Sequence, residues 1–165
     1  MFRHMLLLLF SAFALLVSTG AKAVDPVFAP VPQEMKTQLD KQRLFVSSLV
    51  ANSFPGERLT GTTKDFQLVQ RILDANLIPK SHAWGLQALG VVFGDVLVVA
   101  IPGLAWYQVK DEYGTDPTLR YRATTIQINA LTTLSKRVER SEKLNVEQLA
   151  TQFSQFVATQ AKLYK

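Results

Sequence analysis

Two carboxylates are the side chains best suited to chemistry in this sequence. Asp95 lies within an apolar run from Ala88 to Ile101, where an unpaired carboxylate is costly to bury. Such a group is either a general acid or base, or a structural anchor held by an arginine or by backbone N–H groups. Glu112 is the second candidate, because a pair of carboxylates can hydrolyse a glycosidic bond without a histidine. We favour the anchor role for Asp95, and a small carboxylate-dependent hydrolase of the cell envelope is the alternative.

Other catalytic arrangements are missing from the sequence. Beyond residue 23, His82 is the only histidine, so a Ser-His-Asp triad would have to join it to an acid such as Asp95. The two residues share one predicted helix, which separates them by about 20 Å at 1.5 Å per residue. The chain has no cysteine, and therefore no thiol nucleophile, redox pair or thiolate metal site. We expect no cofactor.

A cluster of acids surrounds Gly114. Asp111, Glu112 and Asp116 would suit calcium by their chemistry. Their spacing does not match a calcium-binding loop, and Pro117 follows at once. We therefore expect a solvated turn and no metal site.

Aromatic and basic residues mark a candidate recognition surface. Trp106 and Tyr107 are neighbours on a predicted strand, so they point to opposite faces. One should join the core, and the other should lie beside Arg120 or Arg122 on the next strand. An exposed aromatic ring beside arginine is common in recognition surfaces, so Trp106, Arg120 and Arg122 are the candidate binding residues.

A short basic run lies further along the chain. It contains Lys136 and Arg137, and Glu139 and Glu142 are interleaved with it at helical spacing. This pattern is typical of a solvated helix face with intrahelical ion pairs, rather than of an anion site.

The first 23 residues have the pattern of a secretory signal peptide. Arg3 and His4 precede an apolar run from Met5 to Val17, and Ala21-Lys22-Ala23 is a small-x-small cleavage site. The alternative is a retained membrane anchor, but the run is shorter than the ~20 apolar residues of a spanning helix. We expect cleavage near Ala23 and a protein that works in the periplasm or is secreted.

The remaining residues fit one globular domain, from residue 33 to 165. Removing Arg3 and Lys22 lowers the net charge of +5 to +3, which gives no reason to expect nucleic acid or anionic lipid as a partner. A chain of this size buries about 68–70% of its unfolded surface, so it can support a core without disulfides. The Pro-rich residues 24–32 are expected to form an extended tether.

Helical periodicity dominates the rest of the chain. The first helix begins near Gln33, and its buried stripe contains Gln42 among apolar residues. The third helix, from Ser81 to Ile101, is apolar nearly all round and should be the buried centre of the fold. Within it, Gly90 and Gly94 share a face and allow another element to approach closely.

Two strands complete the predicted fold. Residues 104–110 and 119–128 are rich in β-forming residues and flank the acidic turn. A second helix from Thr62, a short helix from Leu131 to Ser141 and a last helix capped by Asn145 account for the rest. The expected fold is α+β and mostly helical, with about five helices packed on a two-stranded antiparallel β-hairpin.

These segments, taken in order, resemble a bacterial family known as domain of unknown function 3806. The resemblance covers about residues 40 to 150. It is carried by the series Leu89-Gly90-Val91-Val92-Phe93-Gly94-Asp95, Leu104-Ala105-Trp106, Asp111-Glu112-Tyr113-Gly114, Asp116-Pro117 and Leu134-Ser135-Lys136-Arg137-Val138-Glu139. The resemblance implies no activity, substrate or cofactor. It implies that Asp95, Asp111 and Glu112 matter to the common fold, through pairing with Lys136 or Arg137.

The sequence thus predicts an exported binding or accessory module without enzymatic activity. Its expected partner is an envelope protein or polymer. Neither nucleic acid nor a transmembrane helix in the mature chain is expected.

Overall fold

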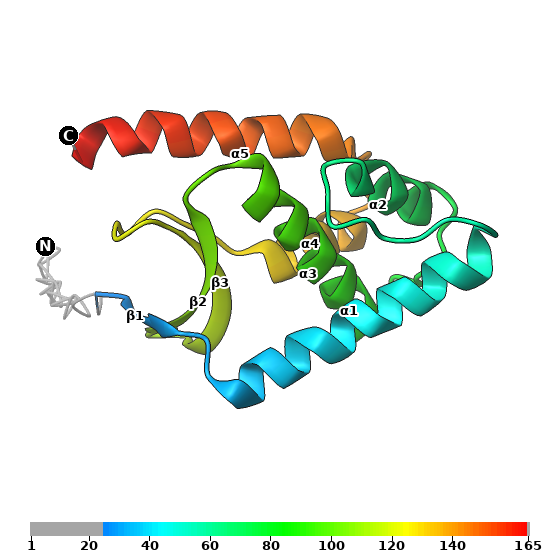
Figure 1. The fold of residues 1–165 in the computed structure, drawn as a ribbon, viewed down its shortest axis with the longest axis horizontal. Coiled ribbons are helices and arrows are strands. Elements are labelled where there is room, and N and C mark those ends of the chain that lie inside the picture. The colour runs from blue at the N-terminus through cyan, green and yellow to red at the C-terminus, as the bar shows by residue number, and fades with distance from the viewer. Residues whose placement is uncertain (1–24, 165) are drawn as a thin grey trace, which may run out of the picture.

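The computed structural model describes residues 25–164, so the predicted signal peptide lies outside the described residues. Figure 1 shows five helices beside a small curved sheet. The elements are β1 (Val27–Pro30), α1 (Gln33–Ser53), α2 (Asp65–Asp74), α3 (Ala83–Ala100), β2 (Leu104–Asp111), β3 (Gly114–Tyr121), β4 (Gln127–Ile128), α4 (Ala130–Glu139), α5 (Val146–Gln160) and a 3-10 helix (Ala161–Tyr164). The mostly helical α+β fold is confirmed.

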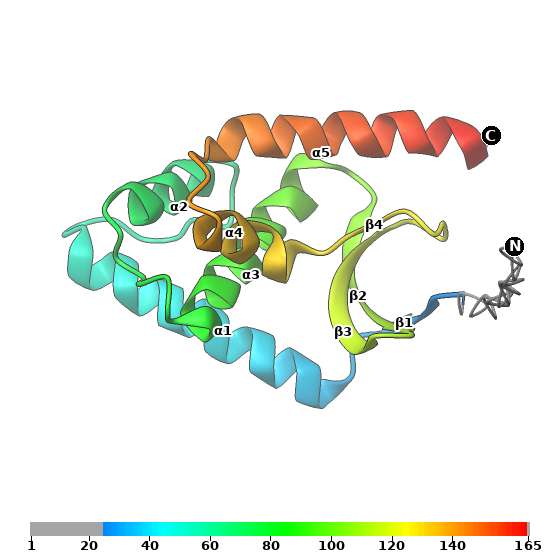
Figure 2. The ribbon, with the colours of Figure 1, turned by 180° about the vertical axis from the view of Figure 1, so that it is seen from behind.

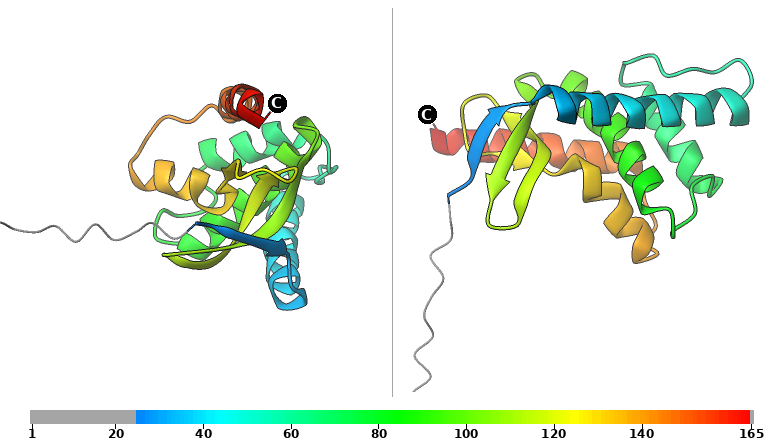
Figure 3. Two further views of the ribbon diagram at one scale, coloured as in Figure 1. Left: turned by 90° about the vertical axis from the view of Figure 1, so that its left-hand side faces the viewer. Right: turned by 90° about the horizontal axis from the view of Figure 1, so that it is seen from below.

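The sheet has four strands where the sequence predicted two. Its order is β1-β2-β3-β4, and every neighbouring pair is antiparallel. The segment expected as a tether contains β1, which pairs with β2 from Val27 opposite Lys110 to Pro30 opposite Tyr107. Proline is tolerated there because β1 is an edge strand. Figure 3 shows β1 at the edge of the sheet, leading into α1.

The second predicted strand, residues 119–128, divides into two in the structure. β3 ends at Tyr121, and the chain turns through Arg122, whose φ is +50°. The Tyr121 N–H donates to the Ile126 carbonyl across this turn. β4 then returns beside β3, with Leu119 opposite Ile128.

Helix α3 is the centre of the fold. It contacts α1, α2, α4 and β2, and α1 and α5 lie on opposite sides of it (Figure 1). Figure 2 shows α4 against α3 from behind. Within residues 25–164, α3 is the one helix long and apolar enough to cross a membrane, and 61% of that span is buried inside the domain. The side chains of Leu89, Phe93 and Leu97 are fully buried, as expected for a core helix.

The close approach predicted at Gly90 is made by α4. A Cβ atom at Gly90 would lie 2.5 Å from the carbonyl oxygen of Leu131 and 2.7 Å from that of Ala130. These distances are shorter than any normal contact, so only glycine allows α4 to begin so close to α3.

Two local hydrogen-bond patterns fix the ends of other helices. The Asn145 side chain caps α5 by accepting from the Gln148 N–H at 2.9 Å, as predicted. Helix α2 begins at Asp65, later than the expected Thr62. The buried Asp65 carboxylate reaches back to accept from the N–H groups of Thr60 and Gly61, which holds the preceding loop against the helix.

Candidate functional site

Asp95 is engaged by partners from two other elements. Arg43 of α1 donates to it through both Nε, at 2.7 Å from Oδ2, and Nη2, at 2.8 Å from Oδ1. The indole Nε1 of Trp106, on β2, donates to Oδ1 at 2.8 Å. A further donation from Arg43 Nη1 reaches Asp40 at 2.8 Å. Asp95 therefore joins α1, α3 and β2, and we call Arg43, Asp95 and Trp106 the Asp95 node.

Gly94 explains why Trp106 can reach this carboxylate. A Cβ atom at Gly94 would lie 2.6 Å from Cζ2 of the indole ring. Without that atom, the ring rests directly on α3 and its N–H meets the next residue, Asp95. On β2, Trp106 pairs with Leu119 of β3, which is fully buried. The second predicted close approach is therefore that of Trp106 to Gly94.

The electrostatics of the Asp95 node favour an anchor over a catalytic acid. The hydrogen bond to Asp95 raises the pKa of Arg43 above its usual value, and it outweighs the opposing effect of burial. The guanidinium stays charged, and both carboxylate oxygens accept hydrogen bonds from it. Bidentate pairing of this kind fixes orientation as well as charge.

The second candidate acid lies far from the first. Glu112 occupies the turn between β2 and β3, six positions beyond Trp106. At about 3.3 Å per residue of strand, this places it about 20 Å along β2 from the Asp95 node. Paired glycosidase carboxylates lie roughly 5–10 Å apart, so Asp95 and Glu112 do not form such a pair.

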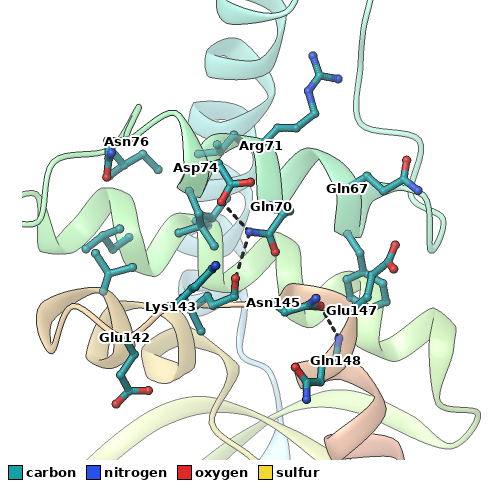
Figure 4. Close-up of a pocket in the computed structure, with 18 of the residues that line it drawn as sticks. Gln67, Gln70, Arg71, Asp74, Asn76, Glu142, Lys143, Asn145, Glu147 and Gln148 are labelled. Carbon is teal, nitrogen blue, oxygen red and sulfur yellow. Dashed lines mark hydrogen bonds between the residues drawn. The ribbon is translucent and has the colours of Figure 1, made fainter.

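A groove that the sequence analysis missed opens between α2 and the connection from α4 to α5 (Figure 4). Its volume is about 960 Å³. Gln70 spans it: its Nε2 donates to Asp74 at 2.8 Å and to the Leu144 carbonyl at 3.2 Å, while its Oε1 accepts from the Val146 N–H at 2.8 Å. This single amide ties the two walls together.

The groove also has polar groups that the fold does not use. A second tie runs from Lys80 Nζ to Ser141 Oγ at 2.6 Å. In the part of the chain that the structure describes, five other polar side chains of the groove make no hydrogen bond; they are Gln67, Asn76, Lys143, Glu147 and Gln148. Figure 4 shows them on both sides of the Gln70 bridge. Gln70 and Lys80 therefore tie the walls of the groove together, while the five other side chains are exposed to solvent along it.

Comparison with known families identifies the domain. A family model described as Domain of unknown function (DUF3806) matches residues 65–149, about half of the chain. The chain belongs to this family. The resemblance predicted from the sequence is confirmed. Every residue that lines the groove lies inside the matched range, whereas Arg43 lies outside it.

A solved structure shares the DUF3806 chain's fold. It is a crystal structure from Bacteroides thetaiotaomicron at 1.50 Å resolution, which matches with a TM-score of 0.70 and 17% sequence identity. The match covers 80% of this chain and 48% of the other, so the DUF3806 chain spans about half the length of that protein. No curated protein matches.

The ion pairs that the family resemblance implied are made with other residues. Asp95 pairs with Arg43, and not with Lys136 or Arg137. The Asp111 carboxylate accepts from the Tyr113 N–H at 2.8 Å, which satisfies it within its own turn. On α4, Arg137 donates to the Thr133 carbonyl at 2.9 Å and lies 3.8 Å from Glu142, while Lys136 is exposed. The basic pair therefore acts locally in the DUF3806 domain.

The three candidate binding residues do not form one surface. Trp106 faces the helices, whereas Arg120 pairs with Ala105 and lies on the opposite face of the sheet. The Arg120 guanidinium lies 4.3 Å from the Phe28 ring centre and 5.4 Å from that of Tyr107. Of the pair Trp106 and Tyr107, it is therefore Tyr107 that lies beside Arg120, with Phe28 closer still. The exposed Arg122 covers the Tyr121 ring at 5.0 Å.

Three smaller features also bear on possible chemistry. His82 is exposed before α3 and packs edge-on against Phe45, with a centroid distance of 5.7 Å. Among residues 25–164, no three His, Cys, Asp or Glu side chains gather where they could hold a metal ion. A hollow of about 380 Å³ lies beside Trp106, with Arg43, Tyr107 and Lys36 in its wall.

Proposed function

We propose that this protein is an exported binding module without enzymatic activity, and that it holds a polar envelope ligand in the groove of Figure 4. The observation that carries this proposal is that some polar side chains of the groove bond its walls together, whereas others make no hydrogen bond. The side chains of Gln70 and Lys80 make hydrogen bonds between the two walls, while five other polar side chains are exposed and make no hydrogen bond within residues 25–164, so they are free to contact a ligand. A site whose walls are already fixed loses little entropy on binding.

The charges of the groove indicate the kind of ligand. Basic and acidic side chains are balanced and interspersed with amides; they are Arg71, Lys80 and Lys143 against Asp74, Glu142 and Glu147. A polyanion such as nucleic acid would need basic groups in excess. Balanced charges with amides suit a ligand that carries both hydrogen-bond donors and acceptors, as envelope proteins and polymers do.

The geometry counts against the alternative of a carboxylate-dependent hydrolase. Both oxygens of Asp95 accept hydrogen bonds from Arg43, and Oδ1 accepts a further one from the Trp106 indole N–H. Glu112 is about 20 Å away along β2, too far to share one scissile bond with Asp95.

Export is supported by the charged and apolar pattern of residues 1–23. The test is the intact mass of the protein recovered from the periplasm after expression of the full chain. We expect the mass of a chain beginning at Val24. Recovery of the uncleaved chain in the membrane fraction would contradict export.

Binding in the groove can be tested by capture from solubilised envelope proteins and from purified cell-wall polymer, with the wild-type protein as bait. We expect Lys143→Ala and Gln148→Ala to weaken capture at least tenfold. Lys136→Ala is the matched control, because Lys136 is an exposed basic residue of α4 outside the groove. Arg120→Ala tests the alternative binding surface on the sheet that was predicted from the sequence. Loss of capture in Arg120→Ala alone would move the ligand to the sheet and overturn the groove.

A further inference from the structure

A second concave site lies between α1, α3 and the β2–β3 hairpin. Its volume is about 700 Å³, and it shares no residue with the groove of Figure 4. Its polar lining includes four glutamines from three elements, of which Gln38 of α1 is exposed at the rim; the other three, which form the floor, are Gln42 of α1, Gln87 of α3 and Gln108 of β2. We call this site the glutamine crevice.

Gln42 is the unusual member of this set. Its side chain lies on the buried stripe of α1 and is only 2% exposed. Within residues 25–164, it makes no hydrogen bond. No fully enclosed side-chain nitrogen or oxygen in this range lacks a partner, so the Gln42 amide must open into the crevice that it lines. Because this amide has no protein partner within residues 25–164, its hydrogen bonds must come from water or from a ligand in the crevice.

The other three glutamines extend the same chemistry. Gln38 lies one helical turn before Gln42, while Gln87 and Gln108 are half-buried. None of their side chains makes a hydrogen bond to the residues that the structure describes. Each carboxamide offers two donors and one acceptor. The crevice therefore presents a row of neutral donors and acceptors from three sides.

The rest of the lining narrows the class of ligand. Among the residues that the structure describes, the apolar lining consists of Pro32, Met35, Leu39, Pro117 and Leu131, and no aromatic ring belongs to it. The charged residues Glu34, Lys41 and Asp116 are all exposed and so lie at its rim. A site without aromatic rings has no platform on which a sugar ring could stack, and a neutral floor gives no advantage to an ion. The amide groups of a peptide backbone carry the same donor and acceptor as the glutamines.

We propose that the glutamine crevice binds an extended, uncharged peptide, whose backbone amides pair with Gln42 and its neighbours and whose aliphatic side chains contact Leu39 and Leu131. This site is separate from the groove and from the function proposed for it. A ligand in the crevice would explain why Gln42 occupies a position on the buried face of α1 that is otherwise apolar.

The test is a titration of ¹⁵N-labelled protein with a pool of capped tetrapeptides, acetyl-Ala-X-X-Ala-amide, in which X is aliphatic or uncharged polar. We expect the side-chain NH₂ signals of Gln42 and Gln108 to shift. We expect Gln42→Leu and Gln108→Leu each to weaken binding at least tenfold. Gln42→Leu should also keep a Tm no lower than that of the wild type, because leucine has a similar volume and removes an amide that makes no hydrogen bond within residues 25–164.

Two controls distinguish peptide binding in the crevice from a general effect of replacing a glutamine and from sugar binding. Gln155→Leu changes an exposed glutamine of α5 that lines neither the crevice nor the groove, and this variant should bind the peptide pool normally. Maltotetraose, added in place of the peptides, should leave the Gln42 signal unchanged. The proposal is overturned if the pool fails to shift the Gln42 and Gln108 amides at millimolar concentration, or if maltotetraose shifts them and the peptides do not. Failure of the groove to bind its ligand would not affect either result.

Discussion

The Asp95 node should contribute measurably to the stability of the fold. The perturbation is a double-mutant cycle with Arg43→Met, Asp95→Asn and the combined variant. Each single change removes the bidentate contact at 2.7 and 2.8 Å and leaves the other charged side chain without this partner. In the combined variant both charges of the pair are gone. The cycle compares the effect of Arg43→Met in the wild type with its effect in Asp95→Asn. The contacts that Arg43 makes with other residues are lost in both comparisons and cancel, so the difference is the free energy of the Arg43–Asp95 pair.

The size of the coupling free energy between Arg43 and Asp95 can be estimated from their hydrogen bonds and from how exposed their side chains are. Hydrogen bonds to charged groups contribute about 1.5–3 kcal/mol, whereas exposed ion pairs contribute about 0.2–1 kcal/mol. The side chains of Arg43 and Asp95 are 33% and 32% exposed, so solvent screening lowers the value. We expect a coupling free energy of about 1–2 kcal/mol.

The assay is unfolding in urea at neutral pH, followed by circular dichroism. Asp95→Ala should cost more than Arg43→Met, because it also leaves the Trp106 Nε1–H without its acceptor. The indole N–H signal of Trp106 in a ¹H–¹⁵N spectrum reports this bond directly. A coupling below about 0.5 kcal/mol, as for an ordinary exposed pair, or an unchanged indole signal in Asp95→Ala would refute the anchor.

Three further outcomes follow from individual contacts. Gly94→Ala places a methyl group 2.6 Å from the Trp106 ring and should destabilise the fold by about 1–3 kcal/mol, with a shift in tryptophan fluorescence; an unchanged spectrum would contradict this packing. Asn145→Ala removes the cap of α5 and should cost about 1 kcal/mol in urea unfolding, whereas Gln148→Ala, which keeps the backbone donor, should cost less. The neighbouring Glu112 carboxylate favours the protonated form of the exposed Tyr113 hydroxyl and so raises the pKa of Tyr113. Glu112→Gln should lower that pKa toward 10.0 in an NMR titration; a pKa that stays raised would exclude this effect of Glu112.

The helices were predictable because each carries its own local signal. The apolar stripe of α1, the uniformly apolar α3 and the Asn145 cap are all patterns within one segment. Strand β1 carries no such signal, since its four residues lie between prolines and pair with β2 more than seventy positions away. The division of β3 from β4 depends on a turn at Arg122, a residue that seldom adopts positive φ.

The candidate site was predictable only in part. The position of Asp95 within an apolar helix indicated that it needs a partner, but the choice of Arg43 depends on how α1 packs on α3. Arg43 lies off the apolar stripe of α1 and resembles any solvated basic residue. The groove was not predictable either, because Gln70 and Leu144 are brought together by packing, and exposed amides on a helix have no periodicity of their own.

The central claim is that the protein binds a ligand in the groove without transforming it. The most direct measurement is to recover the envelope component captured by the wild-type protein and return it to ¹⁵N-labelled protein, with the chemical shifts and the mass of the component followed together. We predict shifts at Gln67, Lys143 and Gln148, and a component of unchanged mass. A component that is cleaved over time, with cleavage lost in Asp95→Asn, would contradict the account and identify an enzyme.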